Sequence, residues 1–140
     1  MNVERHLRLT HAGAMRIIDA ALAKAVAMKK PQCISVVDDG GNLLAFTRMD
    51  GGKVLSIESS MRKAATAASS RAPTGGITGD LEFRLAHATS GRLVNLKGGL
   101  PVIVDGITIG GIGVGSQTGD EDLEVAKAGL AAIEGAKSFD

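Results

Sequence analysis

Six polar residues near the ends of predicted elements have side chains that could bind an anion or transfer a proton. They are Asp38, Arg48, Asp50, Glu58, Arg62 and Lys63. An arginine binds a carboxylate through two parallel hydrogen bonds, and a buried lysine can act as a general base. If short connections bring the six together, Asp38, Arg48 and Lys63 would be the catalytic residues of an enzyme. Alternatively, Asp38 and Asp50 close turns, and Arg48 pairs with one of them.

The three histidines, His6, His11 and His87, do not have the spacing of a structural zinc site, so we expect no metal site. Haem needs only one or two axial ligands from His, Met, Cys or Tyr. His11 begins one predicted helix and His87 lies near the end of another. Either could be an axial ligand, with Arg48 or Lys63 binding a propionate, or each could be a solvated or capping histidine.

Nucleophilic catalysis has little support in the sequence. Ser60 and Lys63 satisfy the bare Ser-x-x-Lys pattern, but the companion motifs of β-lactamases are missing. Cys33 begins an apolar run, where a buried and unreactive thiol is expected. As the sole cysteine, it also excludes an intramolecular disulfide.

The glycine-rich run at residues 110–115 resembles a nucleotide-binding loop only superficially. Ser116 stands where the last glycine of the dinucleotide fingerprint belongs, and the run lies in a β-rich stretch. The interpretation we favour is a strand whose bare backbone lets a helix or another subunit approach closely.

The composition indicates a globular protein of 140 residues, with 44% apolar and 22% charged residues and a net charge of +1. This charge creates no strong field for nucleic acid or an anionic membrane, and 2% aromatic residues disfavour a stacking platform for single strands. No signal peptide is visible and no apolar run approaches the ~20 residues of a membrane span. We therefore expect a cytoplasmic protein, although a mature chain with its signal peptide removed would look the same.

The positions of apolar residues and turn signals predict one α/β (α+β) domain over residues 1–140, in the order α-ββ-α-(α)-ββ-α. Helices are expected over residues 11–29, 53–70 and 79–88, and again after Thr118 or Asp120. Two hairpins are expected, one with the Asp38–Asn42 turn and one with the two-residue turn Asp105-Gly106. We expect a mainly antiparallel, five-stranded sheet flanked by helices, with profilin-like layering.

Several stretches together resemble the GlcG/HbpS family of haem-binding, HbpS-like proteins. Each motif is short, but they extend over nearly the whole chain, from Leu9 to about Ile133. The matching stretches are VVDDGGNLLA at 36–45, RMDG at 48–51, SI at 56–57, KAATA at 63–67, GGLPV at 98–102 and GGIGV at 110–114 with Asp122 downstream.

This resemblance implies an antiparallel sheet flanked by helices and a homo-oligomer, commonly an octamer. Some members bind haem, others belong to catabolic operons, and a related domain forms the C-terminal part of PduO-type adenosyltransferases, whose chemistry belongs to the other part. The chain departs from the family pattern at Gly115-Ser116 and at Lys97, where a third glycine is common. A lysine at position 97 could favour an anionic ligand.

Three hypotheses about function follow. The first is an intracellular small-ligand-binding protein that binds haem as a homo-oligomer, with His11, His87, Arg48 and Lys63 as cofactor-binding residues. The second is a cofactor-free isomerase, hydratase or hydrolase of small organic acid or aromatic catabolism, using Asp38, Arg48 and Lys63, with a substrate contacting Arg48, Lys63, Gly98 and Gly99. The third is an accessory subunit without a ligand.

Overall fold

The computed structural model describes residues 2–140 and confirms the predicted order of elements. The elements are α1 (His11–Met28), β1 (Cys33–Asp38), β2 (Leu43–Arg48), α2 (Leu55–Ser70), α3 (Leu81–Ala88), β3 (Gly99–Val104), β4 (Ile107–Gly115) and α4 (Gly119–Leu130). Two of the predicted caps are present. Thr10 accepts a hydrogen bond from the Gly13 N–H, and Thr118 forms a capping box with Glu121. No helix within residues 2–140 is long and apolar enough to cross a membrane.

The sheet has the strand order β2-β1-β4-β3, and all neighbouring strands are antiparallel. The β3–β4 turn has positive φ at both Asp105 (51°) and Gly106 (75°), which suits a two-residue hairpin. The expectation of five strands was wrong, because the described chain contains four. The two hairpins contribute all four, and the C-terminal segment adds only one isolated bridge, between Ala136 and Val104.

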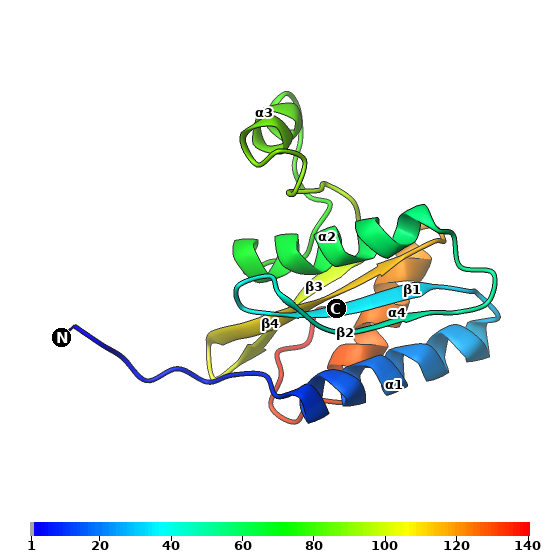
Figure 1. Cartoon of the computed structure of the whole chain (residues 1–140), viewed down its shortest axis with the longest axis horizontal. Coiled ribbons are helices and arrows are strands. Elements are labelled where there is room, and N and C mark those ends of the chain that lie inside the picture. The colour runs from blue at the N-terminus through cyan, green and yellow to red at the C-terminus, as the bar shows by residue number, and fades with distance from the viewer. Residues whose placement is uncertain (1) are drawn as a thin grey trace.

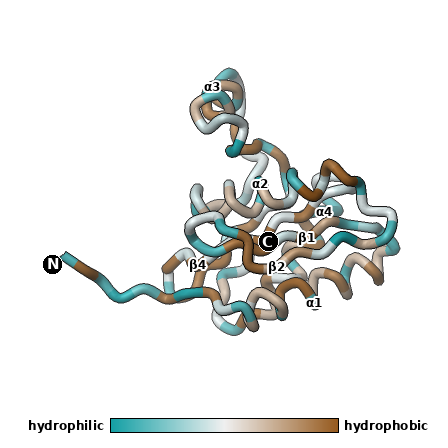
Figure 2. The backbone as a smooth tube through the Cα atoms, viewed as in Figure 1, coloured by the Kyte–Doolittle hydropathy of each residue, from teal (hydrophilic) through white to brown (hydrophobic). Residues whose placement is uncertain are grey.

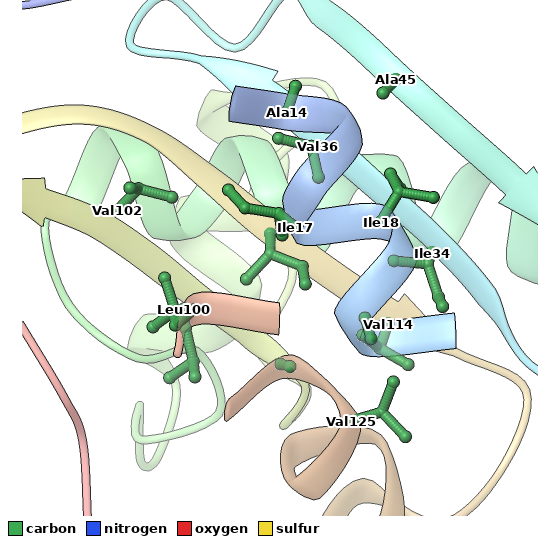
Figure 3. Packing of buried hydrophobic residues seen from close by; sticks show 14 of the residues in the cluster. Ala14, Ile17, Ile18, Ile34, Val36, Ala45, Leu100, Val102, Val114 and Val125 are labelled. Carbon is green, nitrogen blue, oxygen red and sulfur yellow. The ribbon is translucent and has the colours of Figure 1, made fainter. Parts of the chain in front are cut away.

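Helices cover both faces of this sheet, as Figure 1 shows. α1 and α4 pack together on one face, and α2 lies on the other. Since successive side chains of a strand point to opposite faces, Ile34 and Val114 point toward α1 and α4. With Ile17 of α1 and Val125 of α4, they form part of the main hydrophobic core (Figure 3).

Glycines on β4 allow α2 to lie directly on the sheet. A Cβ atom at Gly113 would lie 2.0 Å from the Ser60 carbonyl oxygen, and one at Gly111 would lie 2.4 Å from that of Ala64. No side chain fits in that space. The interpretation of the glycine run as a strand that a helix approaches closely is therefore confirmed.

Two segments extend away from the body. α3 projects beyond α2 and buries none of its side chains (Figure 1), leaving Leu81 and Phe83 exposed. The hydropathy colouring of Figure 2 shows hydrophobic stretches alternating with hydrophilic ones along this projection. Residues 2–8 form an exposed, extended arm that leads to the buried Leu9.

Candidate functional site

A cleft of about 490 Å³ lies between the β1–β2 turn, the C-terminal half of α2 and the segment that follows α3. A volume of this size is in the range of small-molecule sites. The lining residues are Asp39, Gly40, Gly41, Ala65, Thr66, Ser69, Thr89, Arg92 and Leu93.

One wall of the cleft is made of small residues. A Cβ atom at Gly41 would lie only 3.3 Å from the Cβ atom of Ala65, so the β1–β2 turn lies close against α2. The φ angle of Gly41 is +82°, which glycine adopts without strain. This wall therefore presents little side-chain bulk to a ligand.

The segment after α3 contributes Arg92 to the lining of the cleft, and this residue is exposed. Its Nε donates a hydrogen bond to the Thr89 carbonyl (3.2 Å), and within residues 2–140 its two terminal nitrogens make no hydrogen bond. These nitrogens can therefore form a bidentate pair with a carboxylate.

His6 lies at the rim of the cleft because of a contact with Asp39. The Nε2 atom of His6 is 3.0 Å from Oδ2 of Asp39, and both side chains are about half exposed. A protonated imidazole would form an ion pair with the carboxylate.

Asp38 and Arg48 lie at opposite ends of the first hairpin, so the predicted gathering of all six polar residues does not occur. Arg48 pairs with Cys33 at the start of β1, whereas Asp38 ends that strand. Six residues of extended chain span about 17 Å. Asp38 accepts hydrogen bonds from the Gly40 and Asn42 N–H groups (both 2.9 Å), so the alternative that it closes a turn is confirmed. Arg48 forms no ion pair within residues 2–140.

Lys63 is buried and does not line the cleft. Its ammonium donates to the Val114 carbonyl (2.8 Å) and to Oδ2 of Asp122 (3.0 Å). The predicted substrate residues Gly98 and Gly99 are buried beside it. A Cβ atom at Gly98 would lie 3.1 Å from Lys63 Nζ, and one at Gly99 would lie 2.5 Å from the Lys63 carbonyl oxygen. The structure brings these three residues together in the interior.

Asp122 receives further hydrogen bonds in this buried network. Its Oδ1 accepts from the Gln117 N–H (3.1 Å) and, with the Gln32 amide oriented to satisfy its neighbours, from the Gln32 side chain (2.9 Å). Burial raises the pKa of the Asp122 carboxyl above its ordinary value, although the Lys63 ammonium and these hydrogen bonds oppose the shift.

The two histidines predicted as axial ligands are far from each other. His11 is the exposed first residue of α1, on the face of the sheet opposite to α2. His87 is exposed in the last turn of α3, two residues before Thr89 of the cleft. Lys97, the departure from the family pattern, pairs with Asp120 at the surface (2.9 Å).

Ser60 and Cys33 have the structural surroundings that the sequence suggested. Ser60 is buried and hydrogen-bonded to Ser35 (2.8 Å), not to Lys63, so no serine–lysine pair forms. Cys33 is buried beside Ser116, and burial raises the pKa of its thiol.

Sequence reasoning missed Arg92, Thr66 and the link from His6 to Asp39. Arg92 lies in a segment of irregular sequence, and it shares no motif with the β1–β2 turn. Thr66 and the Asp38–Gly41 turn do lie in stretches that resemble the family, and this resemblance was the signal that could have pointed to the cleft.

The sequence and the fold of this chain are both similar to those of known proteins. The family model of the haem degrading protein HbpS-like matches residues 9–131. Protein GlcG of Escherichia coli strain K12 is 40% identical over 107 residues, which are 76% of this chain and 80% of GlcG. The crystal structure of HbpS superposes with a TM-score of 0.79 and 36% identity, covering 94% of each chain. That of a PduOC:haem complex superposes with a TM-score of 0.86 and 25% identity, covering 96% of this chain and all of the other. The chain therefore belongs to the family of haem degrading, HbpS-like proteins.

Proposed function

We propose that this protein binds haem in the cleft beside α2, as a small-ligand-binding member of its family. The observation that carries the proposal is the likeness to the PduOC:haem complex over nearly the whole chain. The cleft of about 490 Å³ has space for a small-molecule ligand between the β1–β2 turn, α2 and the segment after α3.

Two features of the cleft support haem as its ligand. The wall that Gly40, Gly41 and Ala65 form is free of large side chains and suits a flat macrocycle. The terminal nitrogens of Arg92, which make no hydrogen bond within residues 2–140, suit a propionate, the role that the sequence suggested for Arg48 or Lys63. Haem, when bound, would supply redox and ligand-binding chemistry at its iron.

For the axial ligand we propose His87. It lies at the end of α3, from which the chain continues directly into the cleft residue Thr89. His6 at the rim is the competing donor, because its contact with Asp39 brings it to the same cleft. His11 lies beyond the opposite face of the sheet and serves as the control.

A haemin titration tests the function and assigns the ligand. We expect a saturable Soret band for the wild type, and a shifted band for His87→Ala but not for His11→Ala. A shift confined to His6→Ala would move the axial role to His6. The absence of a saturable band in the wild type would refute haem binding.

We also propose that the protein acts as a cytoplasmic homo-oligomer, with the octamer implied by the family resemblance as the expected state. The exposed apolar side chains of Leu55, Leu81 and Phe83, which are 80%, 53% and 71% exposed, support association. Light scattering should give a multiple of the 14.3 kDa chain mass, and a monomer would contradict this part of the proposal.

The alternative of a cofactor-free enzyme receives less support. Its three catalytic candidates do not meet: Asp38 and Arg48 lie at opposite ends of a hairpin, and Lys63 is paired with Asp122 in the interior. We therefore propose no catalytic mechanism.

A further inference from the structure

The wall of the cleft that carries Arg92 has no regular secondary structure of its own. Residues 89–94 follow α3 outside any helix or strand. The N–H groups of residues 89–92 donate to backbone carbonyls, whereas those of Leu93 and Val94 donate to threonine side chains. Thr89 organises the segment from within, because its hydroxyl donates to the Leu85 carbonyl (2.8 Å) and accepts from the Leu93 N–H (3.0 Å). Two side chains of α2 attach the segment to the body.

These two side chains, Arg62 and Thr66, hold the peptide groups on either side of the Arg92 Cα atom. The Nη1 of Arg62 donates to the carbonyl of Gly91, which belongs to the peptide that joins Gly91 to Arg92. The Thr66 hydroxyl donates to the carbonyl of Arg92 (3.4 Å) and accepts from the Val94 N–H (3.1 Å). Residues four apart share one face of a helix, so both anchors come from the same side of α2.

Glu58 fixes the Arg62 side chain, and the absence of a side chain at Gly91 leaves room for the guanidinium. Its Nη2 is 2.5 Å from Oε1 of Glu58, one turn earlier on α2. A Cβ atom at position 91 would lie 3.1 Å from Arg62 Nη1, and the φ of Gly91 is +76°. The close approach of the guanidinium to this backbone therefore suits a glycine.

We propose that Arg62, which does not line the cleft, is a positioning residue that fixes Arg92 and thereby sets the affinity of the cleft for an anionic ligand. The inference rests on the proposed function in that haem is taken as this ligand. Arg62 acts through the Gly91–Arg92 peptide, without touching the ligand. Its effect should therefore depend on the presence of the Arg92 guanidinium.

A double-mutant cycle with haemin as the probe tests this dependence. We expect Arg62→Gln to weaken haemin binding about tenfold, the equivalent of one charge-assisted hydrogen bond. In an Arg92→Gln background, Arg62→Gln should have no further effect. Arg84→Gln on exposed α3 removes the same charge and should bind haemin as the wild type does. Wild-type affinity in Arg62→Gln, or effects that multiply in the double variant, would overturn the proposal.

A second measurement does not depend on any ligand. Exchange of the Val94 amide hydrogen in the ligand-free protein should be faster in Arg62→Gln than in Arg84→Gln, because the anchored segment is loosened. Unchanged exchange would refute the positioning role. If the wild type took up no haemin, the proposed function would fail, while this exchange measurement would still decide whether Arg62 fixes the segment.

Discussion

The Nζ atom of Lys63 lies 3.0 Å from Oδ2 of Asp122, and their side chains are only 6% and 2% exposed. This pair joins α2 on one face of the sheet to α4 on the other. Gly98, with φ +120°, gives it room, because a Cβ atom there would lie 2.9 Å from Asp122 Cβ. Lys63, Asp122 and Gly98 all belong to stretches that resemble the family. The buried ion pair gives each of them a structural role in the interior of the protein.

Lys63→Met should strongly destabilise the protein at neutral pH. It leaves a buried carboxylate without its cation, for which the expected loss is about 3–5 kcal/mol. Lys97→Met is the matched control, because the Lys97–Asp120 pair is exposed and such pairs contribute about 0–1 kcal/mol. Urea unfolding at pH 7 measures both. Equal losses of unfolding free energy in the two variants would show that the buried Lys63–Asp122 pair stabilises the protein no more than the exposed pair does.

The stability that depends on Asp122 should fall as the pH rises from about 4, the ordinary pKa of an unfolded aspartate. Burial raises the pKa of this carboxyl in the folded state, so over the interval between the two pKa values the folded protein binds more protons than the unfolded chain. The free energy of unfolding of the wild type, minus that of Asp122→Asn, should therefore decrease from pH 4 toward neutrality. An increase would mean that Lys63 lowers the pKa by more than burial raises it.

Gly113→Ala should force α2 away from the sheet. The new Cβ atom would lie 2.0 Å from the Ser60 carbonyl oxygen, which belongs to the helix backbone and cannot rotate away. Overpacking of this kind costs about 1–3 kcal/mol or more. Gly76→Ala, where no atom lies within 4 Å of the new Cβ, should be neutral or slightly stabilising in the same unfolding measurement. A neutral Gly113→Ala would contradict the close packing.

The Cys33 thiol should react slowly with a disulfide reagent in the native protein. It is buried, and burial raises its pKa, with opposing effects from Ser116 and Arg48, so little thiolate is accessible. Reaction with 5,5′-dithiobis(2-nitrobenzoate) should become fast in denaturant. Equal rates in native buffer and in denaturant would show that the thiol is accessible in the folded state.

Local patterns in the sequence predicted the elements well because local interactions determine them. The threonine caps, the Asp38 turn and the Asp105-Gly106 turn all depend on residues within a few positions of one another. The close helix approach at residues 110–115 was also predictable, since only a bare strand explains so many glycines in a β-rich run. A fifth strand had no such local signal behind it.

The candidate site was harder to predict because it depends on contacts between distant parts of the chain. Lys63 and Asp122 are 59 positions apart, and no spacing rule pairs them. Arg92 and the β1–β2 turn line the same cleft although they are far apart in the sequence, and Arg62 and Thr66 of α2 bind the backbone carbonyls of Gly91 and Arg92. Asp38 and Arg48 seemed close because a hairpin connects them, but its strands separate them by their whole length.

If the cleft that contains Arg92 is the ligand site, Arg92→Gln should bind haemin more weakly than the wild type does. We predict a dissociation constant about 10–100-fold above that of the wild type, because a charge-assisted bond to a propionate contributes about 1.5–3 kcal/mol. Arg48→Gln, which removes an equal charge outside the cleft, should bind as the wild type does. Unchanged affinity in Arg92→Gln would contradict this assignment, and a loss confined to Arg48→Gln would place the ligand at the other end of the hairpin.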